Sequence, residues 1–220
     1  MVKHHFSEKS VKLEVAQKVL HINNNSDFVQ KILFPSISNY KDFKSGRELK
    51  PFNLRPRELL GGFLVSLVAE HITGELWKFG NNEEGFDGVI YCASGEQKNE
   101  GYQLEQVYAL AINEDLIEVI QQRIANKIND FKNTTHLHLI VYADSNRQAK
   151  LDYKEIAQFL VNKDIPFDSI WIISRKSFEN CSFNVAQIYS HTDPIHLYSI
   201  IINTNDYSTT VKTIAKLNLE

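Results

Sequence analysis

The chain has 220 residues and a formal net charge of −3, with 43% hydrophobic and 23% charged residues. These values are ordinary for a globular protein of one large domain, and the net charge gives no overall positive footprint for nucleic acid. No apolar run approaches the roughly 20 residues that a membrane-spanning helix needs, and no secretory signal is visible. The two cysteines, Cys92 and Cys181, lie far apart in the chain, which favours a reduced, cytoplasmic protein without a disulfide.

Residues 1–52 are interpreted as a helical and basic segment that packs on a core formed by residues 53–220. Ser26 or Asp27 is a candidate N-cap for a short helix that ends before Pro35. A basic stretch follows, and it is either a solvated loop or a contact surface for a polyanion backbone, whose binding would be salt-sensitive. Its cationic side chains are Lys41, Lys44, Arg47, Lys50, Arg55 and Arg57.

A helix is predicted from Pro56, a residue favoured in the first helical turn, to a stop near Thr73 and Gly74. Its apolar residues form a broad face. Gly61 and Gly62 inside it each cost roughly 1 kcal/mol relative to alanine, so the pair predicts the close approach of another backbone.

The remaining pattern predicts strands that alternate with helices. A short strand and a longer one are joined by a turn, and a strong helix follows them. After this helix come a strand–helix–strand unit, whose two strands should be parallel, and two further segments. The fold class is therefore α/β, a mixed central β-sheet flanked by helices. The predicted ranges are 89–92 and 101–112 for strands, 113–131 for a helix with Asn113 as its N-cap, 135–144, 169–174 and 183–190 for strands, 152–162 for a helix, and 197–203 for a strand or helix.

Two acidic residues stand out in the hairpin that these strands predict. Asp87 precedes Gly88 at a strand start, which an Asp-Gly turn alone would explain. Glu105 lies inside an apolar run, where a carboxylate is costly unless it is paired, bound to a metal or turned to solvent. If the two strands pair, the two carboxylates lie side by side, and a divalent cation would remove their repulsion. Oxygen-only ligation suits Mg²⁺ or Mn²⁺.

The order of helix with Glu58, strand with Asp87, strand with Glu105, long helix, strand and helix resembles the PD-(D/E)xK nuclease superfamily between about residues 55 and 174. The resemblance implies a restriction-endonuclease-like core that cuts DNA with magnesium. Asp87 in "FDG" resembles the first acid of the motif, with Phe86 in place of its proline. Glu105 in "LEQV" resembles the second acid, and Glu58 resembles the extra acid on the first helix.

The sequence departs from the family pattern at the lysine. When Glu105 is aligned with the second acid, Val107 occupies the position of the motif lysine. In a second alignment the tripeptide of the motif is Gln103 to Glu105, and Glu105 then occupies the lysine position. Lys98 on the preceding turn is a candidate for the missing cation, and Gln103 could position water although it cannot titrate. The resemblance thus assigns catalysis to Glu58, Asp87, Glu105 and Gln103, and metal binding to Asp87, Glu105 and Glu58.

Three functional hypotheses follow. The first is a metal-dependent DNA endonuclease of restriction or defence type, gripping DNA through the basic stretch. The second is a catalytically silent relative that binds nucleic acid or a protein partner. The third is an unrelated α/β protein in which Glu105 faces water. His136 and His138 have a spacing compatible with metal ligation, but an ordinary strand face explains them better. The oligomeric state is left open, a homodimer being the commonest assembly.

Overall fold

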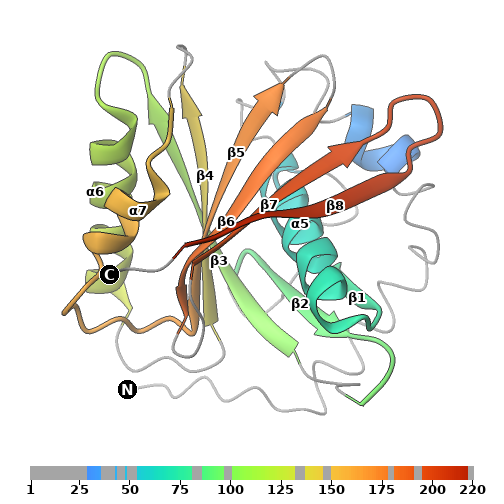
Figure 1. Ribbon diagram of the computed structural model, residues 1–220, viewed down its shortest axis with the longest axis horizontal. Coiled ribbons are helices and arrows are strands. Elements are labelled where there is room, and N and C mark those ends of the chain that lie inside the picture. The colour runs from blue at the N-terminus through green and yellow to red at the C-terminus, as the bar shows by residue number, and fades with distance from the viewer. Residues whose placement is uncertain are drawn as a thin grey trace.

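The structure, a computed structural model, describes residues 29–35, 43, 48, 54–80, 86–96, 101–131, 137–145, 150–177, 181–190 and 195–217. Within these residues the chain forms one curled eight-stranded sheet with helices on both faces (Figure 1). Its helical segments are η1 (Val29–Leu33, a π-helical turn), α5 (Pro56–Thr73), α6 (Leu116–Asp130) and α7 (Tyr153–Gln158). Its strands are β1 (Trp77–Gly80), β2 (Gly88–Cys92), β3 (Gly101–Ala111), β4 (Leu137–Ser145), β5 (Ser169–Ser177), β6 (Ser182–Ser190), β7 (Ile195–Ile202) and β8 (Thr209–Leu217).

The strands lie in the sheet in the order in which they occur in the chain. The β3–β4 and β4–β5 pairs are parallel, and all other neighbours are antiparallel. The mixed sheet, the β2–β3 hairpin and the parallel β4–α7–β5 unit confirm the sequence prediction. The segment 197–203, predicted as strand or helix, is a strand, because β7 pairs with both β6 and β8.

The two faces of the sheet carry separate hydrophobic clusters. One packs α5 against the sheet, and the other packs α6 and α7. Side chains alternate along β3: Leu104 belongs to the α5 cluster, while Ala109 belongs to the α6 cluster. β3 therefore connects the two layers. Its even-numbered side chains point toward α5, and its odd-numbered side chains point toward α6.

Helix α5 is buried on nearly all sides, including every residue from 58 to 68. A helix that is apolar all round lies inside a protein, and here Val29, Leu33 and Phe43 of the N-terminal segment join the cluster that covers α5. The helix stops as predicted, because Gly74 takes the left-handed conformation (φ 72°) and its N–H bonds to the Glu70 carbonyl.

Three sequence predictions need correction. The N-cap of α6 is Asp115 rather than Asn113, since the Asp115 carboxylate accepts the N–H groups of Ile117 and Glu118. Helix α7 is shorter than predicted, ending at Gln158. The glycine pair of α5 receives two side chains rather than a backbone: a Cβ on Gly61 would lie 2.2 Å from the Gln106 Oε1, and one on Gly62 would lie 3.1 Å from the Phe79 ring.

No helix among the described residues is both long enough and apolar enough to span a bilayer.

Candidate active site

Asp87 lies immediately before the first residue of β2. At this point the ladder between β2 and β3 ends. The antiparallel register pairs Gly88 with Leu104, so one further step places Asp87 beside Glu105. The Asp87 carboxylate does not simply close a turn: its Oδ2 accepts a hydrogen bond from the backbone N–H of Gln106 at 2.8 Å. The side chain thus takes the place of a strand neighbour, which fixes it against the middle of β3.

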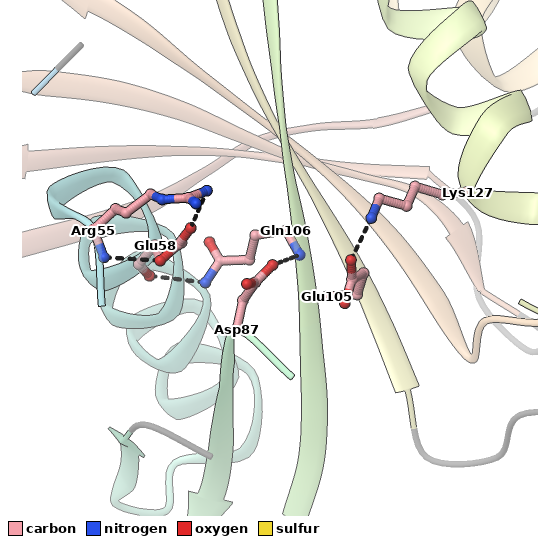
Figure 2. A network of polar contacts seen from close by, with 6 residues as sticks. All are labelled: Arg55, Glu58, Asp87, Glu105, Gln106 and Lys127. Atoms are coloured by element: carbon pink, nitrogen blue, oxygen red, sulfur yellow. Dashed lines mark hydrogen bonds and ion pairs between the residues drawn. The ribbon is translucent and has the colours of Figure 1, made fainter. Parts of the chain in front are cut away.

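Glu105 points from β3 toward α6, where the Lys127 ammonium donates a hydrogen bond to its Oε1 (Figure 2). The Glu105 residue is only 8% exposed, so the alternative in which it faces water is wrong. A buried carboxylate is tolerable only with a partner, and Lys127 is that partner.

Glu58 lies in the first turn of α5 and is 6% exposed. Its carboxylate accepts the backbone N–H of Arg55 at 2.8 Å and pairs with the Arg55 guanidinium at 3.2 Å. An acid at this helical position satisfies a free N–H and is favoured by the helix dipole. Glu58 therefore has a structural role that does not depend on any metal.

Gln106 joins the segments that carry these acids. Its backbone N–H bonds to Asp87, and its side-chain Nε2 donates to the main-chain carbonyl of Glu58 at 2.9 Å. Figure 2 shows Gln106 between Glu58 and Asp87, with Glu105 and Lys127 on the opposite side of β3. Gly61 leaves the space that the Gln106 amide occupies. One glutamine thus sets the distance between the start of α5 and the start of β2.

The three carboxyl groups influence one another electrostatically. Burial is the main cause that raises the pKa of Glu58, of Asp87 and of Glu105 above the ordinary values. The Asp87 charge raises the pKa of both glutamates further, and the Glu58 charge adds to the rise at Glu105. Lys127 opposes the rise at Asp87 and at Glu105. The cluster therefore concentrates negative charge beside a single lysine.

Carboxylate oxygens are the donors that a hard divalent cation prefers, and Glu58 and Glu105 are buried while Asp87 is half-buried. Figure 2 draws Asp87 and Glu105 on opposite sides of β3. Within the described ranges, no three His, Cys, Asp or Glu side chains are grouped so that they could hold a metal ion. Mg²⁺ is commonly bound through one or two carboxylates and several waters, so Asp87 and Glu105 are a sufficient protein contribution.

The structure describes only some of the remaining residues that the sequence analysis singled out. Lys41, Lys44, Arg47 and Lys50 lie outside the described residues, as do Lys98 and His136. Arg55 is exposed beside Glu58, whereas the Arg57 guanidinium lies 5.1 Å from the centre of the Tyr108 ring. Burial lowers the pKa of Arg57. Gln103 is 2% exposed and lies on the same face of β3 as Glu105, and its assigned role stays a prediction.

Sequence reasoning missed Lys127 and Gln106. Lys127 follows the buried Ile124 by three positions and precedes Phe131 by four, so helical spacing places it beside the apolar stripe that faces the sheet. A cation at the margin of a buried stripe could have been flagged from the sequence. Gln106 had no local signal, because its partners lie 19 and 48 positions away.

Comparison with protein-family models, with curated proteins and with solved structures finds no match to this chain. The fold and the site thus define a mixed α/β protein with a buried carboxylate cluster and an adjoining lysine.

Proposed function

We propose that this protein is a metal-dependent nuclease that hydrolyses DNA phosphodiester bonds, with a restriction-endonuclease-like core. The observation that carries the proposal is the cluster of Asp87, Glu105 and Glu58 with Lys127 beside it. The element order supports it: α5, the antiparallel strands β1 to β3, then α6 crossing to the parallel strand β4, with the helices on opposite faces. This order, with Asp87 before β2 and Glu105 within β3, resembles the PD-(D/E)xK superfamily.

Lys127 answers the main departure from the family pattern. The strand position that should carry lysine is Val107, but a cation reaches the second acid from α6 instead. An ammonium in this place can stabilise the negative charge that develops on a phosphate and can orient water. The missing strand lysine therefore does not argue against activity.

Asp87 and Glu105 would hold Mg²⁺ or Mn²⁺, with Glu58 as a further or water-mediated ligand. The bound cation supplies Lewis-acid polarisation of the phosphodiester and lowers the pKa of its water. The chain itself contributes the orientation of Asp87 by Gln106, the charge of Lys127 and the burial of Glu58 and Glu105. Arg55 is exposed next to Glu58 and is suited to contact a phosphate.

The test is nicking of supercoiled plasmid DNA with Mg²⁺. The wild-type protein should convert supercoiled to open-circular DNA, the conversion should stop in excess chelator, and Asp87→Ala should abolish it. Robust cleavage in chelator would exclude the metal-dependent mechanism, and cleavage by Asp87→Ala at the wild-type rate would exclude this site. A restriction or defence role is part of this proposal.

A catalytically silent module that binds nucleic acid or a protein is the second candidate. One observation favours it: each carboxylate already has a partner, Glu58 in Arg55, Asp87 in the Gln106 N–H and Glu105 in Lys127. This candidate predicts salt-dependent DNA binding without any metal requirement. Absence of DNA binding at low salt would remove its nucleic-acid form.

A further inference from the structure

A second site lies at the other end of α5 from Glu58. It is an open cavity of about 360 Å³ between the second half of α5, represented by Val65 and Ala69, and the first residues of β3, β4 and β5. Cavities that bind small organic ligands begin at roughly 300 Å³. Ile72, an exposed apolar side chain, lies among its lining residues.

The walls of the cavity are aromatic. Trp77 and Trp171, the only two tryptophans of the chain, both line it. Trp77 lies nearly parallel to Tyr102, at 18° with ring centres 6.1 Å apart, and Tyr102 stacks on His138 at 4.4 Å. The Trp77, Tyr102 and His138 rings, from β1, β3 and β4, thus form a stacked row in which the Tyr102 and His138 planes are 30° apart. A planar aromatic ligand can extend such a row by stacking.

The two indole rings are held in place by hydrogen bonds that they donate to other lining residues. The Trp77 Nε1 donates to the Thr73 hydroxyl at 2.9 Å, and the Trp171 Nε1 donates to the Ser169 hydroxyl at 2.6 Å. Because neither ring has to be ordered when a ligand enters, the entropic cost of binding is reduced.

Polar groups converge on one side of the same cavity. Asp168 precedes β5, and Gln187 is the register partner of Trp171 on β6. The β5–β6 pairing shifts between Ile170 and Trp171, a β-bulge of the kind that redirects side chains next to binding sites. Asp168 is the one carboxylate among the described lining residues, so the polar side accepts N–H donors and disfavours phosphate.

We propose that this cavity binds an uncharged purine nucleoside through its base, with guanine preferred over adenine. The base stacks on the aromatic row, and its Watson–Crick edge meets Asp168 and Gln187. Guanine offers two adjacent N–H donors to one carboxylate, which adenine cannot do. The site stands apart from the proposed nuclease site, and guanosine has no phosphodiester bond, so binding can be measured whether or not the protein cleaves DNA.

The test uses intrinsic tryptophan fluorescence, because both tryptophans of the chain line the cavity. Titration with guanosine should quench the emission with a saturable curve in the micromolar range, and isothermal titration calorimetry should give the same dissociation constant. Adenosine should bind at least about tenfold more weakly, because adenine lacks the paired donors, and guanosine 5′-monophosphate should bind no more tightly than guanosine, because no lysine or arginine stands among the described lining residues to pair with its phosphate.

Two variants separate the site from nonspecific quenching. Asp168→Asn should weaken guanosine binding by about tenfold or more and leave adenosine binding unchanged, whereas the matched control Asp164→Asn, an exposed residue of the same loop, should bind guanosine as the wild type does. Ala69→Phe, which fills the cavity, should abolish binding of both nucleosides. The proposal is overturned if guanosine gives no saturable signal up to about 1 mM, if Asp168→Asn binds it normally, or if the monophosphate binds more tightly than the nucleoside.

Discussion

Lys127 is the residue on which the proposed catalysis by the carboxylate cluster would depend most directly. It donates a hydrogen bond to Glu105, and its charge also acts on Asp87. We expect Lys127→Met to lower the rate of Mg²⁺-dependent plasmid nicking by about 100-fold or more, the scale of a single positioned acid, base or charge. Lys127→Arg keeps the charge and should retain part of the rate, since its fork geometry differs from that of an ammonium.

Stability measurements show whether Lys127→Met acts only by unfolding the site. Removing Lys127 leaves Glu105 buried without its partner, so urea denaturation should show a loss of about 1–3 kcal/mol. Adding Glu105→Gln removes the uncompensated charge and should restore most of that stability, but it should not restore nicking. Recovery of nicking in the double variant would assign Lys127 a purely structural role.

The raised pKa of Asp87 makes a prediction about pH. A carboxyl group whose pKa is higher in the folded state than in the unfolded chain stabilises the fold below its ordinary pKa, and this stabilisation is lost as the pH rises through the folded-state pKa. Asp87→Asn keeps an oxygen acceptor for the Gln106 N–H but carries no charge. Its melting temperature at pH 7 should therefore exceed that of the wild type by about 2–4 °C, the effect of ~1 kcal/mol in a chain of this size.

Calorimetry between pH 4 and pH 8 would check this, with exposed Asp164→Asn as the control. The gain from Asp87→Asn should shrink as the pH falls toward 4, because the raised pKa lets the wild-type carboxyl take up its proton. Mg²⁺ should raise the melting temperature of the wild type at pH 7 and leave that of Asp87→Asn unchanged, because only the wild type gains a ligand-bound folded state. A lower melting temperature for Asp87→Asn at pH 7 would contradict the raised pKa.

The sequence was sufficient to predict the hairpin whose register places Asp87 next to Glu105, while the metal-binding role of the two acids stays a prediction. It was insufficient for Lys127 and Gln106. Their contacts cross between elements, from α6 to β3 and from β3 to α5, and depend on how the layers pack. Local periodicity gives the face on which a side chain lies but not the residue that it meets on another element.

At the scale of elements, alanine substitutions at the two glycines of α5, Gly61 and Gly62, can separate a contact that positions the acids from ordinary packing. A methyl group at Gly61 would meet the Gln106 Oε1, and that amide would have to move away from the Glu58 carbonyl. In Gly61→Ala the gain in helix propensity, about 1 kcal/mol, offsets a lost hydrogen bond of similar size. Stability should thus change little, while nicking should fall by about tenfold because Asp87 and Glu58 lose their common support.

Gly62→Ala is the matched control, because its methyl group would contact the Phe79 ring and not Gln106. It should keep the wild-type nicking rate, even if the tight contact with Phe79 costs some stability. Plasmid nicking and urea denaturation on both variants give the comparison. Equal nicking rates for the two alanine variants would show that Gln106 does not position the acids.

The two strands that sequence analysis missed, β1 and β8, were missed for different reasons. β1 has only four residues, too few to show an alternating pattern although three of them are buried. β8 is an edge strand with no buried residue, so it carries little hydrophobic periodicity and depends on its ladder with β7. Helix α5 and strands β3 to β5, by contrast, bury enough apolar side chains to produce a hydrophobic pattern that the sequence shows.

At the scale of the whole molecule, β3 unites two layers that are otherwise separate. Gln106 points to α5 and Glu105 to α6, and Asp87 lies immediately before the first residue of β2, bonded to the backbone of β3. The acids therefore depend on contacts with both helical layers, through Gln106 toward α5 and through Lys127, which reaches β3 from α6.

The net charge of −3 requires that any DNA affinity be local, and this gives a test based on salt. Each phosphate contact releases about one counterion, so the plot of log binding constant against log salt concentration loses roughly one unit of slope per contact removed. Arg55→Gln should show this loss in fluorescence anisotropy with duplex DNA. The control is Lys212→Gln on β8, a lysine far from Arg55. Its neighbour Thr213 contacts His71 in the last turn of α5, and His71 lies about 25 Å along the helix from Arg55. An unchanged slope for Arg55→Gln, or an equal change for Lys212→Gln, would place the DNA on another surface.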